Sequence, residues 1–210
     1  MFSEADMPRG FFVRSFAAAA FALTASPIAK AEGPLAIDSA RITIAGTSNV
    51  HAYTASTTTV RVARSQVGAS IIGPEFWENA LKPGAIEAFE IAVPAATLTS
   101  PKDGLDKNMH KALKVQEYPD ITFRLSRFEV NESASGKAKA FGVLRIAGVE
   151  RQVALDITAK RSGSTLAVQG SVDLLMTDYG ITPPKAMLGM LKTDPKVTIT
   201  FETVLSVPLT

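Results

Sequence analysis

The chain has 210 residues, of which 46% are hydrophobic and 20% charged, and its 22 Lys and Arg residues nearly balance its 20 Asp and Glu residues. This balance, without any cluster of Lys or Arg, argues against a protein that binds nucleic acid or an anionic membrane surface. The chain contains no cysteine, so its fold must be stabilised without disulfides. A chain of this length can build a sufficient hydrophobic core.

The first residues have the layout of a secretory signal peptide. Basic residues accompany an otherwise apolar run at residues 11–25, and an A-x-A cleavage site ends at Ala31. The run is shorter than the roughly 20 apolar residues that a membrane-spanning helix needs. We therefore expect residues 1–31 to be cleaved and residues 32–210 to form one exported, periplasmic domain. The alternative is a membrane anchor that is never cleaved.

Most of the remaining sequence alternates between apolar and polar residues with a period of two, which is typical of half-buried antiparallel strands. Gly- and Ser-containing turns separate the alternating runs. About eight strands are expected, near residues 36–45, 48–63, 85–93, 120–130, 137–146, 150–160, 165–176 and 196–207. The sequence therefore predicts an all-β fold, a single antiparallel barrel with short helical connections. A two-sheet sandwich has a similar pattern and stays open as an alternative.

Three connections interrupt the alternation. Residues 74–81 and residues 103–115 have the spacing of short helices. The third connection, residues 178–193, is long, apolar and rich in Met. Its Pro183-Pro184 pair prevents a regular helix at first, whereas residues 185–191 are expected to form about two helical turns. Because most loops are short and polar, this one must be covered by the core of the domain or by an apolar ligand.

One expected strand carries small residues on the face that should point inwards. Ala138, Ala140 and Gly142 alternate in phase with Leu144 and Ile146. An eight-stranded barrel is just wide enough to be filled by side chains or to hold one small ligand. Small inward residues favour a cavity, and a filled barrel acting as a scaffold is the alternative.

Catalytic signatures are scarce. The chain has two histidines, His51 and His110, and it lacks a G-x-S-x-G nucleophile elbow and a phosphate-binding loop. Acidic residues between positions 103 and 120 are more typical of capping and turns than of a cation site. We therefore expect no catalytic residue, no metal site and no cofactor. The alternative is a metal-dependent enzyme that uses His51, His110 and nearby carboxylates.

Several segments, taken in order, resemble the YceI-like family, which is also described as polyisoprenoid-binding and lipocalin-like. They are the strand pair at residues 36–51, the stretch from Met109 to Phe123, the hairpin at residues 142–149 and the closing segment at residues 176–201. The resemblance extends over residues 35–208. It implies a lipocalin-like barrel with an apolar tunnel. It also implies a periplasmic protein that binds, carries or stores a long isoprenoid or another amphiphile.

The predicted ligand is a polyisoprenoid, an isoprenoid quinone or a related lipid. His51 and Tyr53 lie on one strand and would bond to its head group, whereas flexible methionines suit an apolar chain of irregular shape. Phe76 and Trp77 are expected to plug one end of the barrel. The predicted ligand-binding residues are His51, Tyr53, Phe76, Trp77, Met109, Leu113, Tyr118, Phe123, Met176, Tyr179, Ile181, Met187, Leu188 and Met190. Core packing is the alternative for each of them.

The apolar connection at residues 178–193 also has the character of a protein interface. A homodimer, and transient contact with a membrane or a membrane protein, therefore stand beside the apolar small molecule as expected partners.

Overall fold

The structure, a computed structural model, describes residues 33–101, 103–130, 136–186 and 190–207. The predicted signal peptide lies outside the described residues. The strands are β1 (Ala36–Ser48), β2 (Ala52–Thr57), β3 (Arg61–Val67), β4 (Ile86–Pro94), β5 (Asp120–Val130), β6 (Lys137–Ile146), β7 (Val149–Ser162), β8 (Thr165–Leu175), β9 (Lys185–Ala186) and β10 (Leu191–Ser206). The helices are α1 (Phe76–Ala80) and α2 (Asp103–Ala112), and η1 (Ala95–Thr97) and η2 (Met176–Tyr179) are short 3₁₀ turns. A helix with the length and apolar character to cross a bilayer is absent from these described residues.

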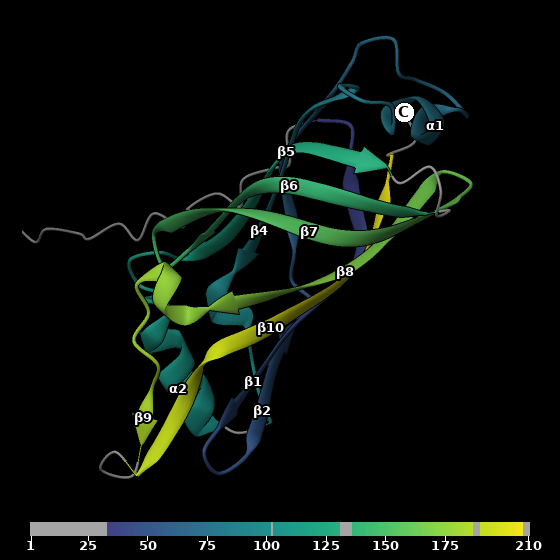
Figure 1. Cartoon of the computed structure of the whole chain (residues 1–210). Helices are drawn as coiled ribbons and strands as arrows, with labels where there is room; N and C mark the ends of the chain where they lie inside the picture. The colour runs from purple at the N-terminus through teal and green to yellow at the C-terminus, as the bar shows by residue number, and fades with distance from the viewer. Residues whose placement is uncertain (1–32, 102, 131–135, 187–189, 208–210) are drawn as a thin grey trace, which may run out of the picture.

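The strands form one antiparallel sheet in the order β2-β1-β10-β8-β7-β6-β5-β4-β3, and β9 pairs with β10 outside this path. The sheet curls into a half-barrel (Figure 1). The predicted all-β, barrel-like fold with short helical connections is therefore confirmed, with nine strands on the main path. The ladder does not join its two edge strands, β2 and β3, among the described residues. An isolated bridge between Ser56 and Thr99 ties β2 to the segment after η1 instead.

The expectation of a single strand over residues 48–63 is wrong, because β2 ends at Thr57 and β3 begins at Arg61. The hydroxyl of Thr57 accepts a hydrogen bond from the backbone N–H of Thr59 at 3.0 Å. Such a local bond competes with the ladder and turns the chain. The alternating pattern continues across this turn, so the sequence does not reveal the turn. The two strands lie at opposite edges of the sheet.

Two separate buried clusters close the two ends of the half-barrel. The α1-end cluster consists of Leu35, Ile71, Phe76, Trp77, Ala80, Leu166 and Leu205. The α2-end cluster consists of Ala95, Leu98, Leu113, Leu144, Ile146, Ala147, Tyr179 and Ile181. Figure 1 shows α1 and α2 at opposite ends of the sheet. The middle of the inner face belongs to neither cluster.

The apolar connection at residues 178–193 contributes to the α2 end. Tyr179 and Ile181 are buried in the α2-end cluster. The expectation of helical turns from residue 185 is wrong, because β9 pairs with Leu191 and Lys192 of β10 (Figure 1). The side chain of Asn49 fixes this hairpin by donating to the carbonyl of Met190 and accepting from the N–H of Lys192, both at 2.8 Å.

Trp77 should be the main anchor of the α1 end. Its side chain is 2% exposed, and its indole N–H donates to the carbonyl of Ser164 at 2.7 Å. Replacing Trp77 with Ala removes a large buried ring, which should lower the free energy of unfolding by about 3–5 kcal/mol. Urea denaturation followed by far-UV circular dichroism measures this. Val50→Ala, at a side chain that is 67% exposed, should change it by less than about 0.5 kcal/mol, and an equal loss in both variants would contradict the assignment.

Candidate functional site

An apolar cavity of about 390 Å³ lies inside the curled sheet. This volume is within the range of about 300–1,000 Å³ typical of small-molecule sites. Inward side chains from β1, β4 to β8, β10 and α1 line it. The polar lining residues of the described part of the chain are Thr203 and two exposed residues, Lys137 and Glu202, which also border a groove on the outer face. The apolar lining includes Ile37, Ile42, Ile44, Trp77, Phe89, Ile91, Ile121, Phe123, Leu125, Phe128, Ala138, Ala140, Leu144, Ile157, Val168, Val172, Ile199 and Phe201. The candidate site is therefore a hydrophobic lumen.

Small residues on β6 help to keep this lumen open. Ala138 and Ala140 line the cavity together with Leu144, so the small face predicted from the sequence does point inwards. In the sheet, Ala138 pairs with Val130 on one side and Ile157 on the other. A methyl group between two larger side chains leaves space in front of the sheet that neither neighbour fills.

Two phenylalanine rings lie against glycines of the neighbouring strands. A Cβ atom added to Gly170 would come within 2.7 Å of the ring of Phe201, and one added to Gly142 would come within 2.6 Å of the ring of Phe123. Both distances are too short for a real contact, so only glycine leaves room for the rings beside the backbone. Rings held against the wall take up less of the lumen than rings pointing across it.

The cavity-lining side chains are less covered than those of an ordinary core. Ile42, Ile199 and Phe201 face inwards, yet each is only partly buried. Protein interiors are normally packed to the density of organic crystals. Partial exposure of inward side chains therefore means that residues across the lumen do not reach them.

The first half of β4 and the second half of β5 are not paired with each other, and we call this unpaired stretch beside the cavity the portal. The ladder of these strands runs only from Pro94 and Asp120 to Glu90 and Arg124. A β-bulge follows in β5 between Leu125 and Arg127, and bulges bend the strand that carries them. Beyond the bulge, half-buried or exposed apolar side chains from β4, β5 and the residue after α1 border the cavity, namely Leu81, Ile86, Phe89, Phe128 and Val130.

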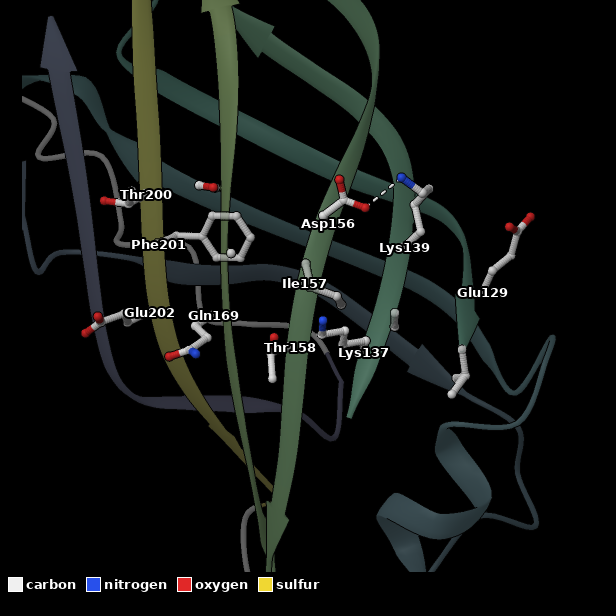
Figure 2. Close-up of a pocket in the computed structure, with 14 residues that line it drawn as sticks. Glu129, Lys137, Lys139, Asp156, Ile157, Thr158, Gln169, Thr200, Phe201 and Glu202 are labelled. Carbon is white, nitrogen blue, oxygen red and sulfur yellow. Dashed lines mark hydrogen bonds and ion pairs between the residues drawn. The ribbon is translucent and has the colours of Figure 1, made fainter. Parts of the chain in front are cut away.

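A second hollow, an open groove of about 770 Å³, lies over β5 to β8 and β10 (Figure 2). Its exposed polar side chains include Lys139 and Asp156, which form an ion pair of 2.6 Å that Figure 2 marks with a dashed line. Exposed ion pairs of this kind contribute little to stability. The groove is larger than the cavity, but a ligand there would stay in contact with water, so the apolar cavity is the stronger candidate.

Another exposed ion pair joins Lys196 of β10 to Asp173 of β8 at 2.8 Å. The hydrogen bond from Lys196 lowers the pKa of Asp173, and the same bond raises the pKa of Lys196. Both side chains are on the solvent side of the sheet. Neither residue lines the lumen.

The predicted head-group residues lie away from the cavity. His51 is exposed in the turn before β2, where its carbonyl accepts bonds from the N–H and the hydroxyl of Ser48, both at 2.9 Å. Tyr53 packs against Gly46, its partner on β1. Neither residue lines the cavity, so their contact with a head group stays a prediction.

The remaining predicted residues divide between the cavity and its ends. Trp77 and Phe123 line the cavity, whereas Phe76 belongs to the α1-end cluster. The residues of the α2 end are Leu113, Tyr179 and Ile181, with Met109 and Met176 packed against them. Tyr118 lies against Gly148, Met190 is 68% exposed, and Met187 and Leu188 lie outside the described residues. Ligand contact by residues outside the lining therefore also stays a prediction.

Sequence reasoning missed most of the lining. Ile42 and Ile44 of β1, Phe89 and Ile91 of β4 and Phe201 of β10 were all assigned to strands but not to a site. Each occupies an inward position of an alternating strand, which reads as core from the sequence. One signal in the sequence could have revealed the cavity. The long strands carry more inward apolar side chains than the few short helices can cover.

Two tyrosines outside the cavity lining, Tyr53 and Tyr179, have perturbed pKa values. The hydroxyls of Tyr53 and Tyr179 are buried without a hydrogen-bond partner in the described structure. Burial raises the pKa of Tyr179 to about 12, although the positive charge of Arg151 acts in the opposite direction. Burial, followed by the negative charge of Asp194, also raises the pKa of Tyr53.

The two histidines do not share a site with carboxylates. A ring nitrogen of His110 is 2.8 Å from the carbonyl oxygen of Leu98. Groups of three or more His, Asp or Glu side chains arranged to hold a metal ion are not found in the described part of the chain.

Tyr179 should make stability depend on pH above about pH 10. A tyrosine in the unfolded chain ionises near pH 10, whereas Tyr179 in the folded protein keeps its proton up to about pH 12. Because the folded state then binds more protons, stability is fully present below pH 10 and falls as the pH rises towards 12. Tyr179→Phe should weaken this fall, measured by urea denaturation at several pH values, and should preserve stability at pH 7 because the lost hydroxyl has no partner. An unchanged pH dependence would contradict the assignment.

The fold is similar to solved structures from three bacteria. BcnA of Burkholderia cenocepacia has 14% sequence identity and a TM-score of 0.60, over 79% of this chain and 95% of its own. A polyisoprenoid binding domain from Saccharophagus degradans has 12% identity and a TM-score of 0.60, over 83% and 99%. The YceI protein of Campylobacter jejuni has 13% identity and a TM-score of 0.51, over 72% and 85%.

Similarity at these identities establishes the fold alone. No curated protein matches the sequence. The model of the YceI-like domain matches residues 36–205, which include every strand of the main sheet almost completely. The chain therefore belongs to the YceI-like family.

Proposed function

We propose that this protein is a non-catalytic carrier that holds an apolar molecule, an isoprenoid or a related lipid, inside the half-barrel. The observation that carries the proposal is the apolar cavity of about 390 Å³ between two packed ends. A related structure is described as a polyisoprenoid binding domain, and the same class of ligand suits this lumen.

The energetics of such a ligand require few specific contacts. Each buried CH₂ group contributes roughly 0.8 kcal/mol, so about ten of them match micromolar affinity even without hydrogen bonds. The lining offers that burial through Ile42, Val172, Ile199 and their neighbours. Lys137, Thr203 and Glu202 are available to a polar head group.

The two other functions considered from the sequence have less support. A metal-dependent enzyme would need His51, His110 and carboxylates together, but His51 is in an exposed turn and His110 contacts the carbonyl of Leu98. A filled-barrel scaffold would need side chains in the space that Ala138 and Ala140 leave. The cavity favours the carrier over both.

We further propose that the carrier acts in the periplasm after export. Support comes from the pattern of residues 1–31, which has a basic start, an apolar run and an A-x-A site. Fractionation of cells that express the full chain, with mass spectrometry of its N-terminus, tests this. A mature protein that begins near Glu32 is expected, and an intact N-terminus in the cytoplasmic fraction would contradict it.

A pair of neighbouring positions tests the carrier function. Val172 faces the cavity, whereas Ser171 is exposed on the opposite side of β8. Val172→Asp should abolish binding of a brominated long-chain alcohol, because an unpaired carboxylate is very costly in an apolar lumen. Val172→Thr, which keeps the shape of the side chain, should weaken binding about tenfold. Ser171→Asp and Ser171→Thr should leave it unchanged.

Trp77, the only tryptophan of the chain, lines the cavity and reports binding through quenching by bromine. Far-UV circular dichroism and urea denaturation show which variants are folded. Saturable quenching in the native protein, its loss in folded Val172→Asp and its weakening in folded Val172→Thr, with both Ser171 variants unchanged, would support the proposal. Absence of saturable quenching, or equal binding in the Val172 and Ser171 variants, would contradict it.

A further inference from the structure

The volume of the cavity limits the length of chain that it accepts. A cavity of about 150 Å³ lined by aliphatic and aromatic side chains binds benzene, which has six carbons, or about 25 Å³ for each carbon. On this scale the cavity of about 390 Å³ accommodates about sixteen carbons. This corresponds to a straight chain of that length or to about three isoprene units.

The strands give an independent estimate of length. The lining residues of β6 run from Lys137, beside the portal, to Leu144 in the α2-end cluster. Seven residue steps of a strand extend over about 23 Å. A fully extended backbone advances about 1.2 Å for each covalent bond, so about nineteen bonds of an extended chain cover that distance. The volume, which corresponds to about sixteen carbons, is therefore the tighter limit.

The two ends of the cavity differ in polarity. Around Leu144 the lining is apolar, with Ile44, Val93, Leu98 and Ile121, and the buried α2-end cluster closes it. The polar lining residues Lys137, Glu202 and Thr203 lie towards the α1 end, because Lys137 begins β6, whose other end is in the α2-end cluster, and the other two precede Leu205 of the α1-end cluster. A polar group would lose its hydration without compensation at the α2 end, whereas the portal keeps it near water.

We infer, on the basis of the proposed carrier function, that the cavity takes a single-chain amphiphile of about sixteen carbons. The tail enters first through the portal between β4 and β5 and points to the α2 end, and the polar head group stays beside Val130 and Lys137. Carbons beyond the sixteenth extend through the portal into water. The ligand class is therefore a short prenyl or fatty chain, and a longer polyisoprenoid is held by only part of its length.

A series of chain lengths tests this inference on the native protein. Straight-chain alcohols with eight to twenty-two carbons, and prenols with two to eight isoprene units, are titrated against Trp77 fluorescence. Affinity should rise about fourfold for each added CH₂ up to about sixteen carbons, and then change less than twofold for each further carbon. Saturable binding whose affinity keeps rising to twenty-two carbons, or peaks below ten, would overturn the chain-length inference and leave the carrier function intact. Absence of binding at every length would overturn both.

Two variants move the limit in opposite directions. The break is the chain length at which affinity stops rising steeply. Ala138→Leu adds three carbons to the wall of the cavity and should shift this break to about thirteen carbons. Leu144→Ala removes three carbons and should shift it to about nineteen. Ala167→Leu, at an exposed position of β8, is the matched control and should leave it at about sixteen. A break that stays in place in both folded cavity variants would overturn the inference.

Bromine position tests the orientation. Trp77 lies in the α1-end cluster, near the portal side of the cavity. A sixteen-carbon alcohol brominated close to its hydroxyl should therefore quench Trp77 more strongly than the isomer brominated close to its methyl end. The reverse order would overturn the assigned direction of entry.

Discussion

The structure depends on how the inner face of one curled sheet is covered. A strand that alternates apolar and polar residues must bury its apolar side. In this protein the α1-end and α2-end clusters cover the two ends of that face, and the available helices, α1 and α2, are too short to cover the middle. The apolar side chains between the clusters line a lumen instead. The two end clusters therefore stabilise the fold, and the lumen between them is available to bind a ligand.

The same division sets where the barrel can open. Neighbouring strands such as β6 and β7 pair along ten residues, from Lys137 to Ile146, whereas β4 and β5 pair along five. Local opening is easiest where fewer hydrogen bonds and fewer packed side chains must separate. The portal therefore lies beside the shortest ladder between neighbouring strands of the main path, and the bulge after Leu125 interrupts β5 where its pairing with β4 ends.

Much of this fold follows from the sequence because a period of two reveals strands and their inward faces. The sequence correctly predicts the small inward face of β6, since Ala138 and Ala140 are unusual on an inward face. It does not predict the break between β2 and β3, because the hydrogen bond from the N–H of Thr59 to the hydroxyl of Thr57 turns the chain without changing the alternating pattern. The candidate site was harder still. An inward isoleucine, such as Ile42, looks the same in sequence whether it meets another side chain or a lumen, and only the pairing of distant strands decides which.

The position of the methionine-rich connection illustrates the same limit. Its apolar residues must be shielded from water. In the described part of this connection, Tyr179 and Ile181 are buried in the α2-end cluster. A tunnel wall and a plug of the barrel end need the same apolar side chains, so the sequence is compatible with either. The difference lies in where the chain crosses the barrel end, which η2 and the pairing of β9 with β10 determine.

The energetics of the lumen explain why its small residues matter. Cavities that side chains leave unfilled lower stability by about 24 cal/mol per Å³, so a space of 390 Å³ corresponds to roughly 9 kcal/mol. This is comparable to the whole free energy of unfolding of a typical domain, about 5–15 kcal/mol. Larger residues at Ala138 or Ala140 would recover part of it. An apolar ligand recovers the same contacts by binding, so the space that weakens the core is also the source of affinity, and folding and ligand binding are thermodynamically linked.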